Sequence, residues 1–120
     1  MIATAGLLAA APLAAQTEQD RAIYEPQYRM ALGDFQKEDT ALQAIEKQIS
    51  QETDLKKGCA LLRTDVEHLQ KEDTLLNQME DYSRRMHWER QQKQATTQHA
   101  AVSENLKNRQ GDIDRLCKNV

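Results

Sequence analysis

Apolar residues recur three and four positions apart through most of this chain. One stretch advances in steps of 4, 3, 4, 3, 4 and 3 through Leu55, Cys59, Leu62, Val66, Leu69, Asp73 and Leu76. Such spacing is typical of an α-helix with a narrow apolar seam on one side. Because a long helix can bury such a seam only against another helix, the pattern predicts a protein that associates through helices.

The seam and its breaks predict five segments in an all-α protein. Residues 1–16 are an Ala-rich tail, and 17–33 are a short helical segment that begins at a capping box on Thr17 and breaks at Pro26. A long coiled-coil helix is expected over 34–95, which contains no proline. Residues 96–101 are expected to bend, since Thr-Thr-Gln-His has low helix propensity, and a second, shorter coiled-coil helix follows at 102–120.

We expect the seam to be the contact between chains in an oligomeric helical bundle. The predicted seam consists of Phe35, Leu42, Ile45, Ile49, Leu55, Cys59, Leu62, Val66, Leu69, Leu76, Met79, Met86, Val102, Leu106, Ile113 and Leu116. Glu52, Asp73 and Arg109 are polar positions on the same stripe. A homodimer would bury two copies of such a charge together, which is costly unless each is paired. Other coiled-coil proteins that supply the complementary charge are therefore favoured as partners, in a hetero-oligomer.

An internal repeat accompanies the seam. The segment 36–42, Gln-Lys-Glu-Asp-Thr-Ala-Leu, returns at 70–76 as Gln-Lys-Glu-Asp-Thr-Leu-Leu, 34 positions later. Tetratricopeptide repeats have this period, but their small-residue and aromatic signature is missing. The repeat is interpreted as a duplicated coiled coil whose seam contains three-residue steps, which overwind a supercoil locally.

The two cysteines are expected to be free thiols. Cys59 and Cys117 lie 58 positions apart, which is about 87 Å along a straight helix. A disulfide requires Cα atoms within about 7 Å, so the chain would have to reverse near residue 88, where 86–90 carries no glycine, proline or asparagine. An intrachain disulfide is therefore not predicted.

Composition narrows the function classes. Charged residues make up 29% of the chain and aromatic residues 4%, and the net charge is -3. Few large side chains are available to enclose a pocket, so a small-molecule substrate is not expected. Nucleic acid is not an expected partner either, since the cations form no basic face. No catalytic constellation, metal-ligand spacing or cofactor motif occurs, so the prediction is a protein that is not an enzyme and holds no cofactor or metal.

Tyr24, Tyr28, Leu32 and Phe35 form an aromatic and apolar face ahead of the long helix. Apolar faces usually pack within their own assembly, which is the favoured interpretation. A docking patch for a partner is the alternative.

Residues 1–15 resemble the apolar core and cleavage end of a secretory signal, with Ala15 before Gln16 at the expected cleavage site. No Lys or Arg precedes Arg21, so the basic region that opens such signals is missing. The stretch is too short to span a bilayer as a helix, and no transmembrane segment is predicted.

Three stretches carry a resemblance to a known family. They are Phe35 with Ile45 and Ile49, the run 62–69 with Leu76 and Met79, and the run 101–107 with Asp112, Ile113, Leu116 and Cys117. In order and spacing, over residues 24–120, they resemble the C-terminal coiled-coil domain of the central-channel FG nucleoporin. The resemblance implies a scaffold subunit in a heteromeric coiled coil at the nuclear pore. No Phe-Gly dipeptide occurs here, so binding of transport receptors is not implied.

The leading hypothesis is therefore an intracellular interaction subunit of a heteromeric helical bundle, similar to a nucleoporin scaffold. The first alternative is an exported helical protein of a cell envelope, chaperone-like or part of a secretion apparatus. That protein would be periplasmic or secreted if residues 1–15 are a signal. The second alternative is a cytoskeletal or centrosomal coiled coil.

Overall fold

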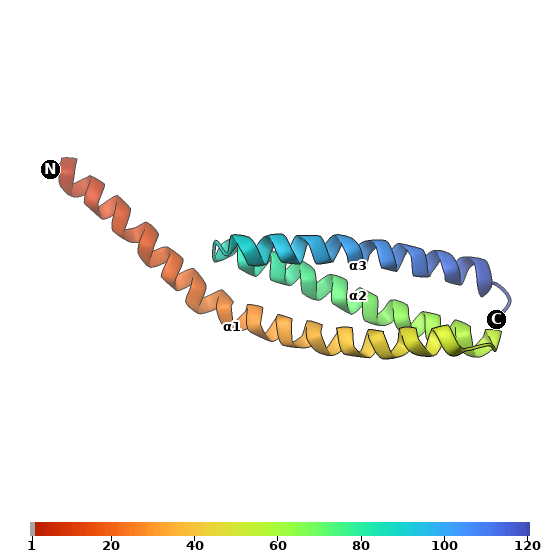
Figure 1. Cartoon of the computed structure of the whole chain (residues 1–120). Coiled ribbons are helices and arrows are strands. Elements are labelled where there is room, and N and C mark those ends of the chain that lie inside the picture. The colour runs from red at the N-terminus through yellow and green to blue at the C-terminus, as the bar shows by residue number, and fades with distance from the viewer. Residues whose placement is uncertain (1) are drawn as a thin grey trace.

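The computed structural model describes residues 2–120, with side chains from Gln16 onward, and it is all-α. Three helices follow one another, α1 (Ile2–Gln51), α2 (Leu55–Arg85) and α3 (Glu89–Leu116). Each reverses direction relative to the one before it, and the first part of α1 extends beyond the other two helices (Figure 1). The result is an elongated antiparallel bundle, 78 Å along its longest axis. The predicted signal-like tail, residues 1–15, lies outside the residues whose side chains are described.

The predicted break at Pro26 is wrong, because α1 continues through it from Ile2 to Gln51. Figure 1 shows α1 bending in its orange part, the region of the sequence that holds Pro26. Proline removes one helical hydrogen bond and crowds the preceding turn, which bends a helix that its neighbours hold in place. The segment expected to be a separate short helix is therefore the beginning of a long one.

The predicted single helix over 34–95 is also wrong, because the chain turns at residues 52–54. Asp54 caps the start of α2, and its carboxylate accepts a hydrogen bond from the Lys57 backbone N–H at 2.9 Å. The Asp54 carbonyl also accepts from the Gly58 N–H at 2.8 Å. An aspartate cap satisfies an N–H that the first turn of a helix leaves free, so a helix starts here although the turn at residues 52–54 contains no glycine or proline.

The second turn lies at residues 86–88, and the bend expected at 96–101 is instead an uninterrupted part of α3. His87 adopts a left-handed backbone conformation, with φ of 59°. Its N–H donates to the Arg84 carbonyl at 3.1 Å, and the Trp88 N–H donates to the Ser83 carbonyl at 2.8 Å. These two bonds form a Schellman motif, the usual end of a helix, in which glycine ordinarily holds the left-handed position. Histidine tolerates that conformation better than most residues, which explains how a turn escaped detection here.

Replacement of His87 by glycine should stabilise the fold. The left-handed conformation costs a side-chain-bearing residue about 1 kcal/mol that glycine does not incur. His87→Gly should therefore raise the free energy of unfolding, measured by urea denaturation, by up to about 1 kcal/mol. Ala100→Gly, at an exposed position inside α3, is the control and should lower it by about 1 kcal/mol. Equal decreases in the free energy of unfolding for His87→Gly and Ala100→Gly would contradict the Schellman motif.

The turns explain the internal repeat. Residues 52–54 and 86–88 are separated by 34 positions, the same period as the two related segments. Segment 36–42 lies in α1 and segment 70–76 in α2. The repeated unit is therefore one helix with the turn that follows it. The three-residue steps between Ile49 and Leu55, predicted to overwind a supercoil, mark the first of these turns.

The prediction that the two cysteines are free thiols is wrong, because Cys59 and Cys117 form a disulfide, with Cα atoms 5.9 Å apart. The chain reverses at residue 88, midway between them, which is the one geometry that sequence analysis identified as sufficient. The bond joins the first turn of α2 to the residue after α3. Leu62 is buried beside both cysteines, and Ile49 and Ile113 pack against them.

Most of the predicted seam is buried or half-buried within this one chain. Cys59, Leu62, Leu69, Leu76 and Met79 are buried on α2. Leu42 on α1, Met86 at the second turn and Val102 on α3 are also buried, whereas Phe35, Ile45, Ile49, Val66, Leu106 and Ile113 are half-buried. Leu55 and Leu116 are exposed, at 55% and 47%. The seam is thus covered largely by the protein's own helices, and its existence no longer requires a second chain.

Two of the three polar seam residues, Asp73 and Arg109, meet complementary side chains within the chain. Arg109 Nε lies 3.1 Å from Asp65 Oδ2, and His99 Nε2 lies 2.8 Å from Asp73 Oδ1. Glu52 is half-buried in the first turn. Asp73 and Arg109 therefore meet complementary side chains between α2 and α3, and these two residues no longer favour a second protein as the partner of the seam.

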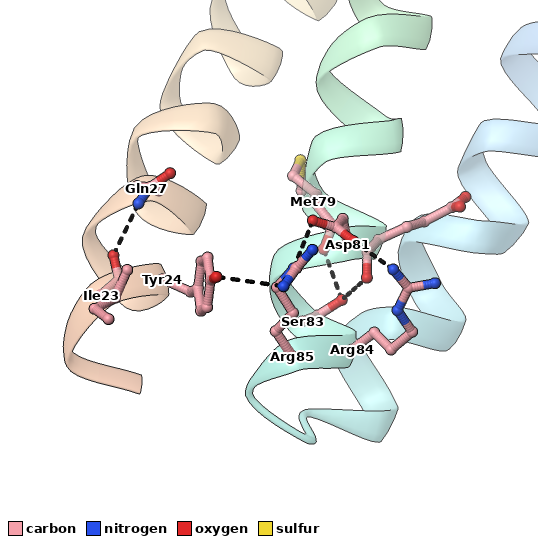
Figure 2. A network of polar contacts seen from close by, with 9 residues as sticks. Ile23, Tyr24, Gln27, Met79, Asp81, Ser83, Arg84 and Arg85 are labelled. Carbon is pink, nitrogen blue, oxygen red and sulfur yellow. Dashed lines mark hydrogen bonds and ion pairs between the residues drawn. The ribbon is translucent and has the colours of Figure 1, made fainter. Parts of the chain in front are cut away.

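The aromatic face of α1 packs within the chain, as the favoured interpretation held. Tyr24 stacks on Tyr82 with ring centroids 5.9 Å apart, and Tyr28 meets the Trp88 ring edge-on at 5.5 Å. Figure 2 shows Arg85 lying between Tyr24 and Asp81, with hydrogen bonds to the Tyr24 hydroxyl at 3.3 Å and to Asp81 at 2.9 Å. This cluster fixes the middle of α1 against the turn between α2 and α3.

A candidate binding groove between α1 and α3

A groove runs along the bundle because α1 and α3 both pack against α2, whereas within residues 2–120 their backbones do not approach each other. Figure 1 shows α2 between the other two helices. In a closed three-helix bundle, the outer helices would meet and cover the remaining face of the central one. Here that face stays open, and we call the opening the α1–α3 groove.

The groove consists of two hollows that share Phe35 and Gln98. The first, of about 370 Å³, is lined by Phe35, Asp39, Leu42, Gln43, Glu46, Leu69, Glu72, Gln98, Ala101, Val102 and Asn105. The second, of about 340 Å³, is lined by Tyr28, Leu32, Phe35, Gln36, Met79, Gln91, Gln94, Ala95 and Gln98. On α3 the lining extends from Gln91 to Asn105, roughly 21 Å of helix.

The lining is amphipathic and one-sided in charge. Apart from Glu72, its deepest side chains are apolar core residues, among them Leu69 at 2% exposure, Met79 at 3% and Val102 at 7%. Glutamines stand along both helical walls, and Asp39, Glu46 and Glu72 all belong to the first hollow. No Lys, Arg or His is among the described residues that line either hollow. The groove therefore offers apolar contact along its length and negative charge at one end.

Glu72 is the most unusual of these residues. It is 2% exposed, and its Oε2 has no hydrogen-bond partner among the described residues. Burial raises the pKa of the Glu72 carboxyl from 4.5 to about 8, helped by the hydrogen bond and charge of Asp39 and by the charges of Glu38 and Glu46. A buried carboxyl without a cation costs the fold free energy, so this site is poorly satisfied by the chain alone.

Asp65, two turns before Glu72 on α2, differs from Glu72 in having a cation beside it, Arg109. Burial raises the pKa of its carboxyl, and the charge of Arg109 opposes that rise. Sequence analysis assigned Val66 and Asp73 to the seam, whereas Asp65 and Glu72 are the fully buried residues at those steps. Because α2 contacts α1 on one side and α3 on the other, its buried stripe is wider than the seam of a two-stranded coiled coil. The stripe therefore includes Asp65 beside Val66, and Glu72 beside Asp73.

Two histidines hold the helices together beside the groove. His68 Nδ1 on α2 is hydrogen-bonded to the Glu38 carboxylate on α1. His99 on α3 lies between two carboxylates of α2, with Nε2 2.8 Å from Asp73 and Nδ1 2.8 Å from Glu80. These contacts account for both histidines structurally, and they leave Asp39, Glu46 and Glu72 without such a partner.

Sequence analysis found only part of this groove. Phe35, Leu42, Leu69, Met79 and Val102 belong to the predicted seam and line it. The other seam residues lie elsewhere, in the cluster around the disulfide, in the core beneath the groove or at the surface. The acidic residues and glutamines were missed. A usable signal was present for Glu72, which lies three positions from Leu69 and four from Leu76, at the spacing of a core residue.

No known protein family, curated protein or solved structure matches this chain. Among the residues described with their side chains, no group of three or more His, Cys, Asp or Glu is arranged to hold a metal ion. In that same part of the chain, no helix is both long and apolar enough to cross a bilayer.

Proposed function

We propose that this chain is an interaction subunit that holds a helix of another protein in the α1–α3 groove, outside the cytoplasm. The observation that carries the proposal is the open groove itself, whose floor consists of core residues. Glutamine walls and an apolar floor suit a helix with one apolar face, which would complete a four-helix bundle. The heteromeric helical assembly expected from the sequence is thus kept, with the groove in place of the seam as its contact.

The disulfide supports the location. Disulfides persist in secreted and periplasmic proteins and are rare where glutathione keeps thiols reduced. Residues 1–15 have the apolar core and cleavage end of a secretory signal, although their basic region is missing. Together these features favour the exported envelope protein over a nuclear-pore scaffold or a cytoskeletal coiled coil.

Paired variants test the docking site. Ala101 lines the first hollow and is exposed, and Ala100 is exposed beside it on α3 but does not line the groove. A tryptophan at position 101 should fill the hollow and abolish cross-linking to partner proteins in the native host, whereas Ala100→Trp should leave it intact. Equal cross-linking by both variants would refute docking in the groove.

The location has its own test. Mass spectrometry of the protein isolated without reducing agent should find a chain that begins at Gln16 and contains the Cys59–Cys117 bond. Free thiols on a chain that keeps residues 1–15 would refute an extracytoplasmic location.

A further inference from the structure

We propose that the helix held in the groove carries a lysine or arginine opposite Glu72 and an apolar residue seven positions away, opposite Tyr28 and Met79. This inference rests on the proposed function and specifies its partner: an amphipathic helix of about four turns with a cation on its apolar face.

The carboxylates of the first hollow carry the argument. Glu72 Oε2 is buried and has no hydrogen-bond partner in the described part of the chain, although its residue lines an open hollow. Asp39 lines the same hollow, and its carboxylate has no cation: it accepts a hydrogen bond from the Gln43 amide at 3.0 Å and shares one with the Glu72 carboxyl. Glu46 lines it as well, from an exposed position two turns farther along α1 than Asp39.

Every other buried or bridging carboxylate between the helices has a cation or a histidine. Asp65 has Arg109, Glu38 has His68, and Asp73 and Glu80 share His99. The carboxylates in the groove are the exception among the described residues. A cation brought by a ligand would complete the same arrangement, since a charge-assisted hydrogen bond is the strongest contact available to a buried carboxylate.

The second hollow sets the spacing. Its lining includes Tyr28, Leu32, Met79 and Ala95, and no acidic residue among those described. Glu72 and Met79 are seven positions apart on α2, about 10.5 Å along the helix axis. A helix lying beside α2 in either direction places residues i and i+7 on one face at the same separation. A cation and an apolar anchor seven residues apart therefore meet both hollows at once.

The lysine or arginine also implies a pH dependence of binding. At neutral pH the Glu72 carboxyl is largely protonated, since its pKa lies near 8. The groups that face it are Asp39, Glu38 and Glu46 on α1, whereas α3 presents only Gln98, Ala101, Val102 and Asn105 to that hollow. A cation must displace the proton, so binding at pH 7 should release protons, as measured by calorimetry in buffers of different ionisation enthalpy.

A peptide selection tests the inference without a known partner. A displayed library of 15-residue helical peptides, randomised on one face, is selected on the oxidised protein and counter-selected on Ala101→Trp. Enriched peptides should carry Lys or Arg seven positions from a large apolar residue. Their affinity should fall about tenfold on Glu72→Gln, the loss expected when a hydrogen bond to a charged group is removed. Glu67→Gln, an exposed position on α2, should leave it unchanged.

The outcomes separate the inference from the function on which it rests. Peptides that Ala101→Trp excludes, but that lack a cation or bind Glu72→Gln equally well, would overturn the lysine or arginine and leave groove docking standing. Failure to enrich any peptide that Ala101→Trp excludes would overturn both. Self-association of the protein that Ala101→Trp abolishes would identify a second copy as the occupant and overturn the inference.

Discussion

Reduction of the Cys59–Cys117 disulfide should lower the free energy of unfolding by about 4 kcal/mol, because the bond closes a loop of 58 residues in the unfolded chain. The bond holds the last residues of the chain against the start of α2, where Leu62, Ile49 and Ile113 pack around it. Urea denaturation followed by circular dichroism, with and without a reducing agent, measures the difference. The helical signal without urea should persist, since Leu69 and Leu76 form a separate part of the core.

The double variant Cys59→Ala/Cys117→Ala is the control. Its unfolding midpoint should match that of the reduced protein and should not respond to reducing agent. An oxidised protein whose midpoint equals that of the variant would contradict a stabilising bond. Sequence analysis led to the opposite expectation, since it placed the two cysteines far apart on a chain that did not turn at residue 88.

Helices could be predicted from the sequence because their signal is repeated many times. The 3–4 spacing occurs through α1, α2 and α3, so the all-α class and most buried positions follow from it. The turns depend on single residues. Asp54 is an ordinary helix cap, and His87 occupies a left-handed position that glycine usually holds, so neither residue marks a turn clearly in the sequence. With both turns missed and a bend expected at residues 96–101 instead, the two cysteines and the 34-residue repeat were interpreted along one long helix over 34–95 and not as marks of a hairpin.

The candidate groove was hidden for a different reason. Sequence periodicity identifies the apolar face of a helix, but it does not say how many neighbours that face meets. Asp65, Glu72 and Ser83 are fully buried on α2, and a search for apolar residues passes over all three. Whether such a residue is neutralised depends on a side chain far away in sequence, as Arg109 is for Asp65. The position of the groove follows from the arrangement of α1 and α3 around α2, which no local pattern encodes.

The free energy of unfolding should fall as the pH rises from about 4.5 to 8, and Glu72 should account for much of the fall. Its pKa is raised to about 8 in the folded protein, so the folded chain binds a proton that the unfolded chain, at 4.5, has released. The Glu72 contribution is therefore most favourable below 4.5, is lost through this window and stays lost above 8. The rise in the Glu72 pKa from 4.5 to about 8 corresponds to about 5 kcal/mol in the free energy of unfolding.

Glu72→Gln isolates this contribution, because glutamine has nearly the shape of the protonated glutamic acid and does not ionise. The variant should match the wild-type protein at pH 4.5 and exceed its free energy of unfolding by an increasing margin up to pH 8. Urea denaturation at half-unit steps of pH measures that difference. Glu67→Gln on the exposed face of α2 is the control for the loss of one carboxylate from the same helix. A difference for Glu72→Gln that stays constant from pH 4.5 to 8 would mean that the buried carboxyl already has a counter-charge, and the groove would then offer no unpaired carboxylate to a cationic partner.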